Sequence, residues 1–152
     1  MDDIDKKILQ LLQADASLSV REIADVVGLT STPCWRRVQA LENSGVISKR
    51  VALLDLQSVN LTLTALVLIR TNEHNAEWTE RFLTTVERFE EVVEAYRTSG
   101  ELDYMLKVVV PDMDAYDQFY LRLIEHIDLY DVRSTFVMEE MKHTTALPLG
   151  YV

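Results

Sequence analysis

The sequence of 152 residues is poor in the residue types that build disulfide frameworks, metal sites and membrane spans. Its one cysteine, Cys34, excludes a disulfide within the chain and suits a reducing compartment. Its three histidines, His74, His126 and His143, are scattered without metal-ligand spacing. No stretch approaches the roughly 18 consecutive apolar residues of a membrane span, and residues 1–5 are acidic, unlike the basic start of a secretory signal. We therefore expect a cytoplasmic protein with no membrane segment, no metal and no cofactor.

Signs of a catalytic site are also few. The sequence has no glycine-rich phosphate loop, and no nucleophile is spaced from a base that would activate it. Only Asp103, Tyr104 and His126 are candidates for the converging titratable groups that a catalytic pocket needs. An enzyme is therefore a weak interpretation of this chain, and we expect no catalytic residues.

What the sequence has is the composition of a soluble globular protein with unevenly distributed charge. Apolar residues make up 48% of the chain, charged residues 26%, and the formal net charge is −10. Such a charge opposes nucleic acid as a partner, but residues 61–152 carry −9 of it and residues 1–60 only −1. Residues 31–50 hold four basic side chains and one acidic one. Because salt screens distant charges, this local patch is compatible with phosphate binding.

The first third of the chain predicts three helices. The first starts at an N-terminal aspartate and carries an apolar face at helical spacing. The second covers residues 20–27, where Ser19 and Glu22 form a capping box and Gly28 supplies a left-handed end. The third follows within three residues and runs to about Asn43. A short helix, a glycine turn and a second helix at this spacing predict a helix-turn-helix.

The third helix has a polar side that we assign to DNA. Trp35, Val38 and Leu41 share one spacing, so we expect them in the core, with Trp35 a core residue and not a platform for stacked bases. Cys34 is expected to be a small buried residue and not a redox sensor. The outward side then presents groups suited to base edges and phosphates: Ser31, Thr32, Arg36, Arg37 and Gln39. The alternative is a merely solvated helix face.

Residues 46–53 form a short extended stretch that we interpret as a wing or small strand beside the third helix. Lys49 and Arg50 lie in this stretch and suit contact with phosphates, although the same two bases could simply solubilise a hairpin. We therefore place a DNA-binding domain over residues 1–53 and a polar linker over residues 54–60.

The remaining part, residues 61–152, alternates strand and helix patterns. Strands are predicted over 61–69, 91–99, 104–110 and 132–138, and helices over 76–89 and 113–127. This order is the α+β, split βαβ arrangement of ferredoxin-like domains, which have both helices on one face of the sheet. The first strand is apolar on both sides, so we expect a second copy of the chain to cover the bare face in a homodimer.

These features together resemble the Lrp/AsnC family (leucine-responsive/asparagine-synthase-regulator, feast/famine) of transcription regulators. The resembling segments span essentially the whole chain: residues 5–9, 27–30, 32–38, 41–42, 45–47, 99–104, 135–138 and 142–149. The resemblance implies a winged helix-turn-helix followed by a ferredoxin-like βαββαβ domain that dimerises through its sheet. It also implies double-stranded DNA as a partner and higher assembly, commonly into octamers. An amino acid or related metabolite would alter assembly or DNA affinity.

The resemblance places this effector at the turn between the second and third strands of the sheet. The residues it implies there are Gly100, Glu101, Leu102, Asp103 and Tyr104. On the last strand, Ser134 and Thr135 offer hydroxyls to a ligand carboxylate. Without the resemblance, the same turn would be interpreted as an ordinary hairpin with glycine at a positive φ.

Two functions follow from the sequence. The first is a sequence-specific DNA-binding transcription regulator that responds to an amino acid or related small metabolite. The alternative is an architectural DNA-binding protein that assembles without a small-molecule signal. Calorimetry with a panel of amino acids separates them, because only the first predicts heat of binding or a change in assembly.

Overall fold

The structure, a computed structural model, describes all residues from Met1 to Val152 and divides them into two compact units. The first unit contains Met1–Leu53 and Met141–Val152, and the second contains Leu54–Glu140. This division differs from the predicted one at the C-terminus, because residues 141–152 belong to the helical unit and not to the ferredoxin-like unit. None of the helices combines the length and hydropathy that a membrane span requires.

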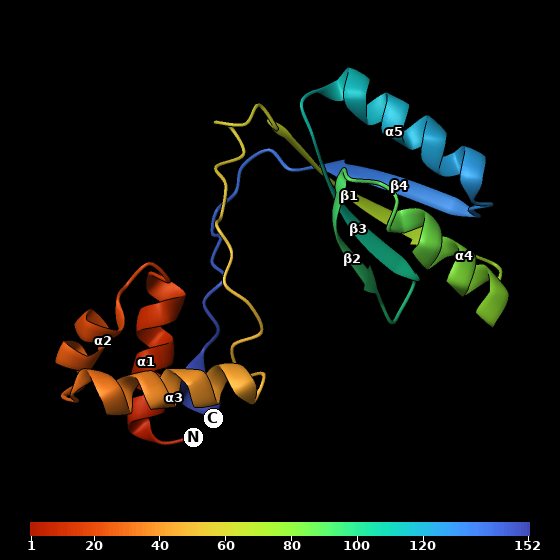
Figure 1. Cartoon of the computed structure of the whole chain (residues 1–152). Helices are drawn as coiled ribbons and strands as arrows, with labels where there is room; N and C mark the ends of the chain where they lie inside the picture. The colour runs from red at the N-terminus through yellow and green to blue at the C-terminus, as the bar shows by residue number, and fades with distance from the viewer. The chain divides into compact units, whose positions relative to one another are not determined.

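Three helices form the first unit: α1 (Asp3–Ala14), α2 (Val20–Val27) and α3 (Ser31–Asn43) (Figure 1). Their apolar faces meet in a small core of seven buried residues: Ile8, Leu9, Ile23, Ala24, Cys34, Val38 and Leu41. Cys34 is completely buried there, as predicted.

Capping groups fix where the first two helices begin. The Asp2 carboxylate accepts from the Asp5 N–H at 2.9 Å, and the Asp5 carboxylate accepts from the Asp2 N–H at 3.1 Å. Ser19 and Glu22 form the predicted capping box of α2, in which the Ser19 N–H donates to the Glu22 carboxylate at 2.7 Å. Gly28, at φ 74°, ends α2 in the left-handed conformation, so the turn into α3 forms at the predicted residue.

The C-terminal segment is attached to α1 by a two-way hydrogen-bonded clamp. The Leu147 N–H donates to Oε1 of Gln13 at 2.6 Å, and Nε2 of Gln13 donates to the Leu147 carbonyl at 3.3 Å. Two residues later Leu149 packs against the apolar core of the first unit and begins the short 3-10 helix η1 (Leu149–Tyr151). The tail is therefore a structural part of this unit.

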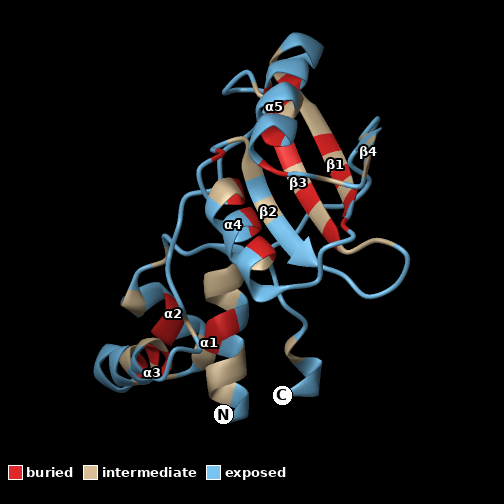
Figure 2. Ribbon diagram, turned by 90° about the vertical axis from the view of Figure 1, so that its right-hand side faces the viewer, coloured by how far each residue is buried: buried red, intermediate tan, exposed pale blue.

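The second unit has the predicted βαββαβ order. Its elements are β1 (Leu63–Arg70), α4 (Ala76–Val86), β2 (Val92–Arg97), β3 (Tyr104–Val110), α5 (Met113–His126) and β4 (Asp131–Phe136). The strands form one antiparallel sheet in the order β2-β3-β1-β4. Both helices lie on the same face of this sheet (Figures 1 and 2).

Alternation along the central strands divides the sheet into a covered and a bare face (Figure 2). Ala65, Val67 and Ile69 of β1 are buried beneath the helices, together with aromatic residues such as Phe82 and Phe119. Leu66 and Leu68 have the opposite parity and are only partly buried within one chain. The bare face therefore keeps apolar side chains in partial contact with solvent.

Candidate DNA-binding surface and effector site

The orientation of α3 follows from the residues that it buries. Cys34, Val38 and Leu41 form its core stripe, whereas Trp35 is 52% exposed. The prediction that Trp35 lies in the core was therefore wrong. Either Trp35 or Cys34 can share a helical stripe with Val38 and Leu41. Helices α1 and α2 pack against the stripe that contains Cys34, which lies about 100° around the helix from Trp35. Burial also raises the pKa of the Cys34 thiol, which keeps this group protonated.

The polar residues assigned to DNA occupy different surroundings on α3. Ser31, Thr32 and Arg36 are exposed, and Gln39 is half-buried. Arg36 has no ion-pair partner within the protein. Its side chain is therefore available to a partner on the solvent side of the helix.

Arg37 is engaged within the protein. Its Nη1 lies 2.7 Å from carboxylate oxygens of both Asp5 and Asp2, at the N-terminus of α1. Hydrogen bonds to Asp5 and Asp2 raise the pKa of Arg37, and the Asp5 N–H and Arg37 lower the pKa of Asp2. This network joins α3 to the first turn of α1, and it engages the Arg37 guanidinium that the sequence predicts to contact DNA.

Residues 46–53 contain no helix or strand, so the predicted small strand is absent. Arg50 donates to the Glu42 carboxylate at 2.8 Å, and Gln39 donates to the same carboxylate at 2.7 Å. Lys49 is exposed and has no such partner. Free positive charge near the end of α3 is therefore supplied by Lys49, whereas Arg50 is partly neutralised by Glu42.

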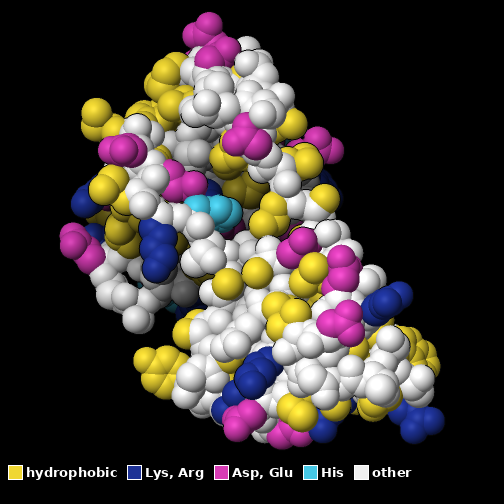
Figure 3. Space-filling view, turned by 90° about the vertical axis from the view of Figure 1, so that its left-hand side faces the viewer, with side chains coloured by type: hydrophobic (Ala, Val, Ile, Leu, Met, Phe, Trp, Pro, Cys, Tyr) yellow, Lys and Arg dark blue, Asp and Glu magenta, His cyan; other side chains and the backbone are white.

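On the face shown in Figure 3, Lys and Arg side chains lie in separate small groups and form no single large patch. Electrostatic attraction to phosphates is therefore confined to a few local groups on this face.

The turn between β2 and β3 is closed by its own hydrogen bonds. The Thr98 hydroxyl donates to the Leu102 carbonyl at 2.6 Å, and Gly100 has a φ of 124°. The Asp103 carboxylate accepts from the Thr71 N–H at 2.8 Å, and its other oxygen lies 4.0 Å from Nδ1 of His74. Asp103 thus ties the hairpin to the loop between β1 and α4, while Glu101 stays exposed.

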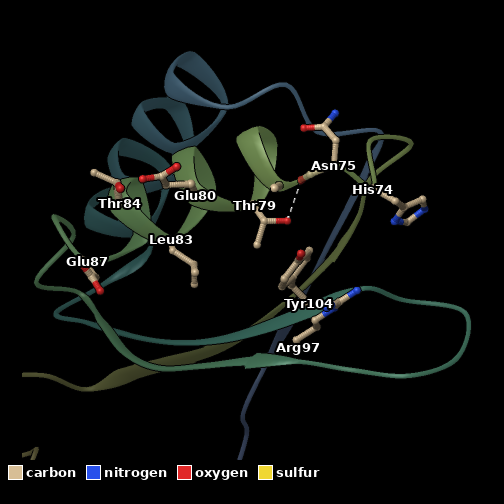
Figure 4. Close-up of a pocket in the computed structure, with 10 residues that line it drawn as sticks. His74, Asn75, Thr79, Glu80, Leu83, Thr84, Glu87, Arg97 and Tyr104 are labelled. Carbon is tan, nitrogen blue, oxygen red and sulfur yellow. Dashed lines mark hydrogen bonds between the residues drawn. The ribbon is translucent and has the colours of Figure 1, made fainter.

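Next to this hairpin, an open hollow of about 490 Å³ lies between α4 and the ends of β2 and β3 (Figure 4). Ten residues line it: His74, Asn75, Ala76, Thr79, Glu80, Leu83, Thr84, Glu87, Arg97 and Tyr104. Tyr104 and Arg97 rise from the sheet toward α4 because they face each other in the β2–β3 register. The Tyr104 ring also packs against Phe82, with ring centroids 4.4 Å apart.

Of the predicted effector residues, Tyr104 lines this hollow and Gly100–Asp103 form the hairpin beside it. Arg97 and the α4 residues were not predicted, because nothing near them in the sequence indicates a ligand. Ser134 and Thr135 lie on β4, at the opposite edge of the sheet from β2. The Ser134 hydroxyl is hydrogen-bonded to the Tyr116 hydroxyl, and Thr135 points to the other face. One chain therefore does not bring them to the hollow.

A helix-turn-helix with a free arginine on its outer side, joined to a ferredoxin-like unit with a polar hollow, defines a DNA-binding regulator with a ligand-binding domain. Comparison with known proteins supports this class. Residues 1–48 match the family model for a winged helix-turn-helix DNA-binding domain, and residues 64–147 match that for the Lrp/AsnC ligand binding domain. The chain belongs to the Lrp/AsnC family of transcription regulators, as the sequence motifs indicated, and this family is not one of enzymes.

Relatives of this chain match along nearly its whole length. It is 48% identical to the DNA-binding transcriptional activator DecR of Escherichia coli (strain K12), covering 98% of this chain and 99% of DecR. A crystal structure of an AsnC family transcriptional regulator from Agrobacterium tumefaciens is 55% identical, with a TM-score of 0.96 and 99% of each chain covered. A transcriptional regulator from Neisseria meningitidis, solved as a complex with L-Met, is 38% identical, with a TM-score of 0.95 and coverage of 99% and 98%.

Proposed function

We propose that this protein is a sequence-specific transcription regulator whose DNA affinity or assembly responds to an amino acid bound in the hollow between α4 and the β2–β3 hairpin. The observation that carries the proposal is that side chains of both charges line this hollow. Arg97 lies on β2, on the sheet side, whereas Glu80 lies on α4 and Glu87 directly follows that helix. None of these three side chains has an ion-pair partner within the protein.

This arrangement is complementary to an amino-acid zwitterion. A guanidinium group such as that of Arg97 holds a carboxylate through two parallel hydrogen bonds. A glutamate on α4 accepts hydrogen bonds from the ammonium group, and both interactions strengthen as the ligand excludes water. Leu83 and the Tyr104 ring provide apolar surface for the side chain of the ligand. The L-Met complex of the Neisseria meningitidis regulator supports an amino acid as the class of effector.

The hairpin gives the site a connection to the rest of the sheet. Asp103 follows the exposed turn and is bonded to Thr71, in the loop that leads to His74 and Asn75 at the rim of the hollow. A ligand that moves this rim therefore acts on both the hairpin and the start of α4. Gly100, Glu101 and Leu102 contribute to the site as its exposed border.

For the DNA-bound state, we place α3 in the major groove. Arg36 and the outward polar side chains Ser31, Thr32 and Gln39 face base edges and phosphates, and Lys49 lies over the phosphate backbone. Arg50 adds a weaker phosphate contact because Glu42 shares its charge. Two such helices read half-sites about 34 Å apart, or a multiple of that distance.

A dimer supplies the two copies of α3 that read the two half-sites. Leu66, Leu68 and Met105 on the bare face of the sheet are partly exposed within one chain, and Tyr96 beside them is 49% exposed. Covering them with the same surface of another copy forms a closed, two-fold interface. Further association of dimers into octamers follows the pattern implied for this family. Light scattering measures the molar mass of this assembly.

The experiment is a thermal-shift screen of the twenty amino acids, followed by calorimetry on any that stabilise the protein. Arg97→Ala removes the carboxylate partner, and Arg81→Ala serves as a matched control because Arg81 is exposed on α4, has no ion-pair partner and does not line the hollow. We expect one or a few amino acids to raise the Tm of the wild type and of Arg81→Ala but not of Arg97→Ala. Absence of heat and of any shift for all twenty would favour the architectural function instead.

A further inference from the structure

The exposed side chain of Trp35 on α3 has no role among the polar contacts proposed for DNA binding. The chain has two tryptophans, and they occupy opposite environments. Trp78 is 1% exposed in the core of the ferredoxin-like unit, whereas Trp35 is 52% exposed. The Trp35 indole takes no part in the core of the first unit, because α3 contributes Cys34, Val38 and Leu41 to that core instead.

The position of Trp35 on the helix is defined by its neighbours. It lies one turn from Thr32 on one side and from Gln39 on the other, and it directly precedes Arg36. Arg37 lies on the opposite flank, where Asp2 and Asp5 hold it against α1. One flank of α3 is thus closed by an ion-pair network, and the flank that carries Trp35 is open to a partner.

From this geometry we propose that Trp35 is a specificity-determining residue, which makes an apolar contact with the 5-methyl group of a thymine in the major groove. The inference rests on the proposed use of α3 as the DNA reader. A thymine methyl is the apolar group that base pairs present in the major groove, and apolar side chains recognise it by direct contact. The indole carries no charge, so it adds discrimination between sequences without neutralising a phosphate.

The indole is also suited to this contact for an entropic reason. A tryptophan side chain has only two rotatable side-chain bonds, so its broad apolar surface becomes ordered on binding at little conformational cost. Trp35 therefore supplies contact area beside Arg36, while Arg36 and the hydroxyl groups of the same face supply hydrogen bonds.

The test begins with an operator selected from random DNA by the wild-type protein. Each thymine of that operator is then replaced in turn by uracil, which removes only the 5-methyl group. We expect one position per half-site at which the wild type loses affinity by about fourfold, the factor for burial of one methyl group. The variant Trp35→Ala should bind the thymine and uracil versions equally well, and its salt dependence should match that of the wild type.

Two further measurements distinguish the possible failures. Arg36→Ala is titrated in parallel, and the Tm of each variant shows that it is folded. If Trp35→Ala keeps the full preference for thymine, or weakens operator and unrelated DNA equally, the role of Trp35 is refuted while loss of binding by Arg36→Ala still supports α3 as reader. If neither variant changes operator affinity, the assignment of α3 itself is refuted.

The natural fluorescence of the protein gives an independent check. Trp78 is buried and insensitive to aqueous quenchers, so quenching by iodide reports on Trp35 alone. Operator DNA should protect this component from quenching, and the Trp35→Phe variant should lack it. Unchanged quenching of Trp35 in the operator complex would contradict the contact.

Discussion

Adjacent arginines on α3 should have separable effects on DNA binding and on stability. Arg36 is exposed and unpaired, whereas Arg37 is bonded to Asp2 and Asp5 at 2.7 Å each. Each phosphate contact contributes about 0.9 to the slope of log K against log salt concentration, so a dimer that uses two copies of Arg36 should lose about 1.8 in Arg36→Ala. Arg37→Ala should leave this slope unchanged and lower the Tm of the first unit, because it leaves two carboxylates of α1 without their cation.

Fluorescence anisotropy of labelled operator at several salt concentrations measures the slope, and circular dichroism measures the Tm. A matched variant, Arg81→Ala, removes an exposed arginine from α4 in the other unit and should change neither quantity. A flatter salt dependence with an unchanged Tm in Arg37→Ala, or an unchanged slope in Arg36→Ala, would contradict these roles of the two arginines.

Three other predictions concern the first unit. Hydrogen bonds lower the pKa of Asp2 and of Glu22 below their ordinary values of 3.8 and 4.5; their contribution to stability is therefore complete above those values and lost as the pH falls through the lowered ones. Thermal melts from pH 6 to pH 2 should show a steeper loss for the wild type than for Glu22→Gln. The Cys34 side chain is completely buried, and burial raises the pKa of its thiol. Cys34 should therefore react with a thiol reagent only at the rate of unfolding, and rapid labelling of native protein would contradict this. Leu149→Ala should destabilise the first unit by about 1 kcal/mol, less than a fully buried leucine, and urea unfolding that does not distinguish it from wild type would show that the tail is not docked.

The parts of the fold that were predictable from the sequence depend on local or periodic signals. Ser19 and Glu22, three residues apart, form the capping box that starts α2. Gly28 ends this helix because glycine readily adopts the left-handed backbone conformation. The strand Tyr104–Val110 is bounded by a hairpin on one side and Pro111 on the other, so its predicted limits agree with the structure. The βαββαβ order follows from such segments taken together.

The parts that were missed depend on contacts between distant residues. Trp35 and Cys34 both extend the Val38 and Leu41 stripe, and only the packing of α1 and α2 decides between them. The clamp between Gln13 and Leu147 joins residues 134 positions apart, with no local signal in either segment. Similarly, Arg97 enters the hollow because strand register places it opposite Tyr104.

Control of DNA binding by an effector is measured through the operator affinity of the protein with and without an amino acid that binds to it. Linkage requires that the factor by which this amino acid changes the Kd for operator equals the factor by which operator changes the Kd for the amino acid. We predict a factor of about 5 or more in both titrations for wild type, within the usual range of such couplings, and a loss of coupling in Arg97→Ala. An amino acid that binds in the hollow while operator affinity and assembly stay constant would show that the hollow does not control DNA binding.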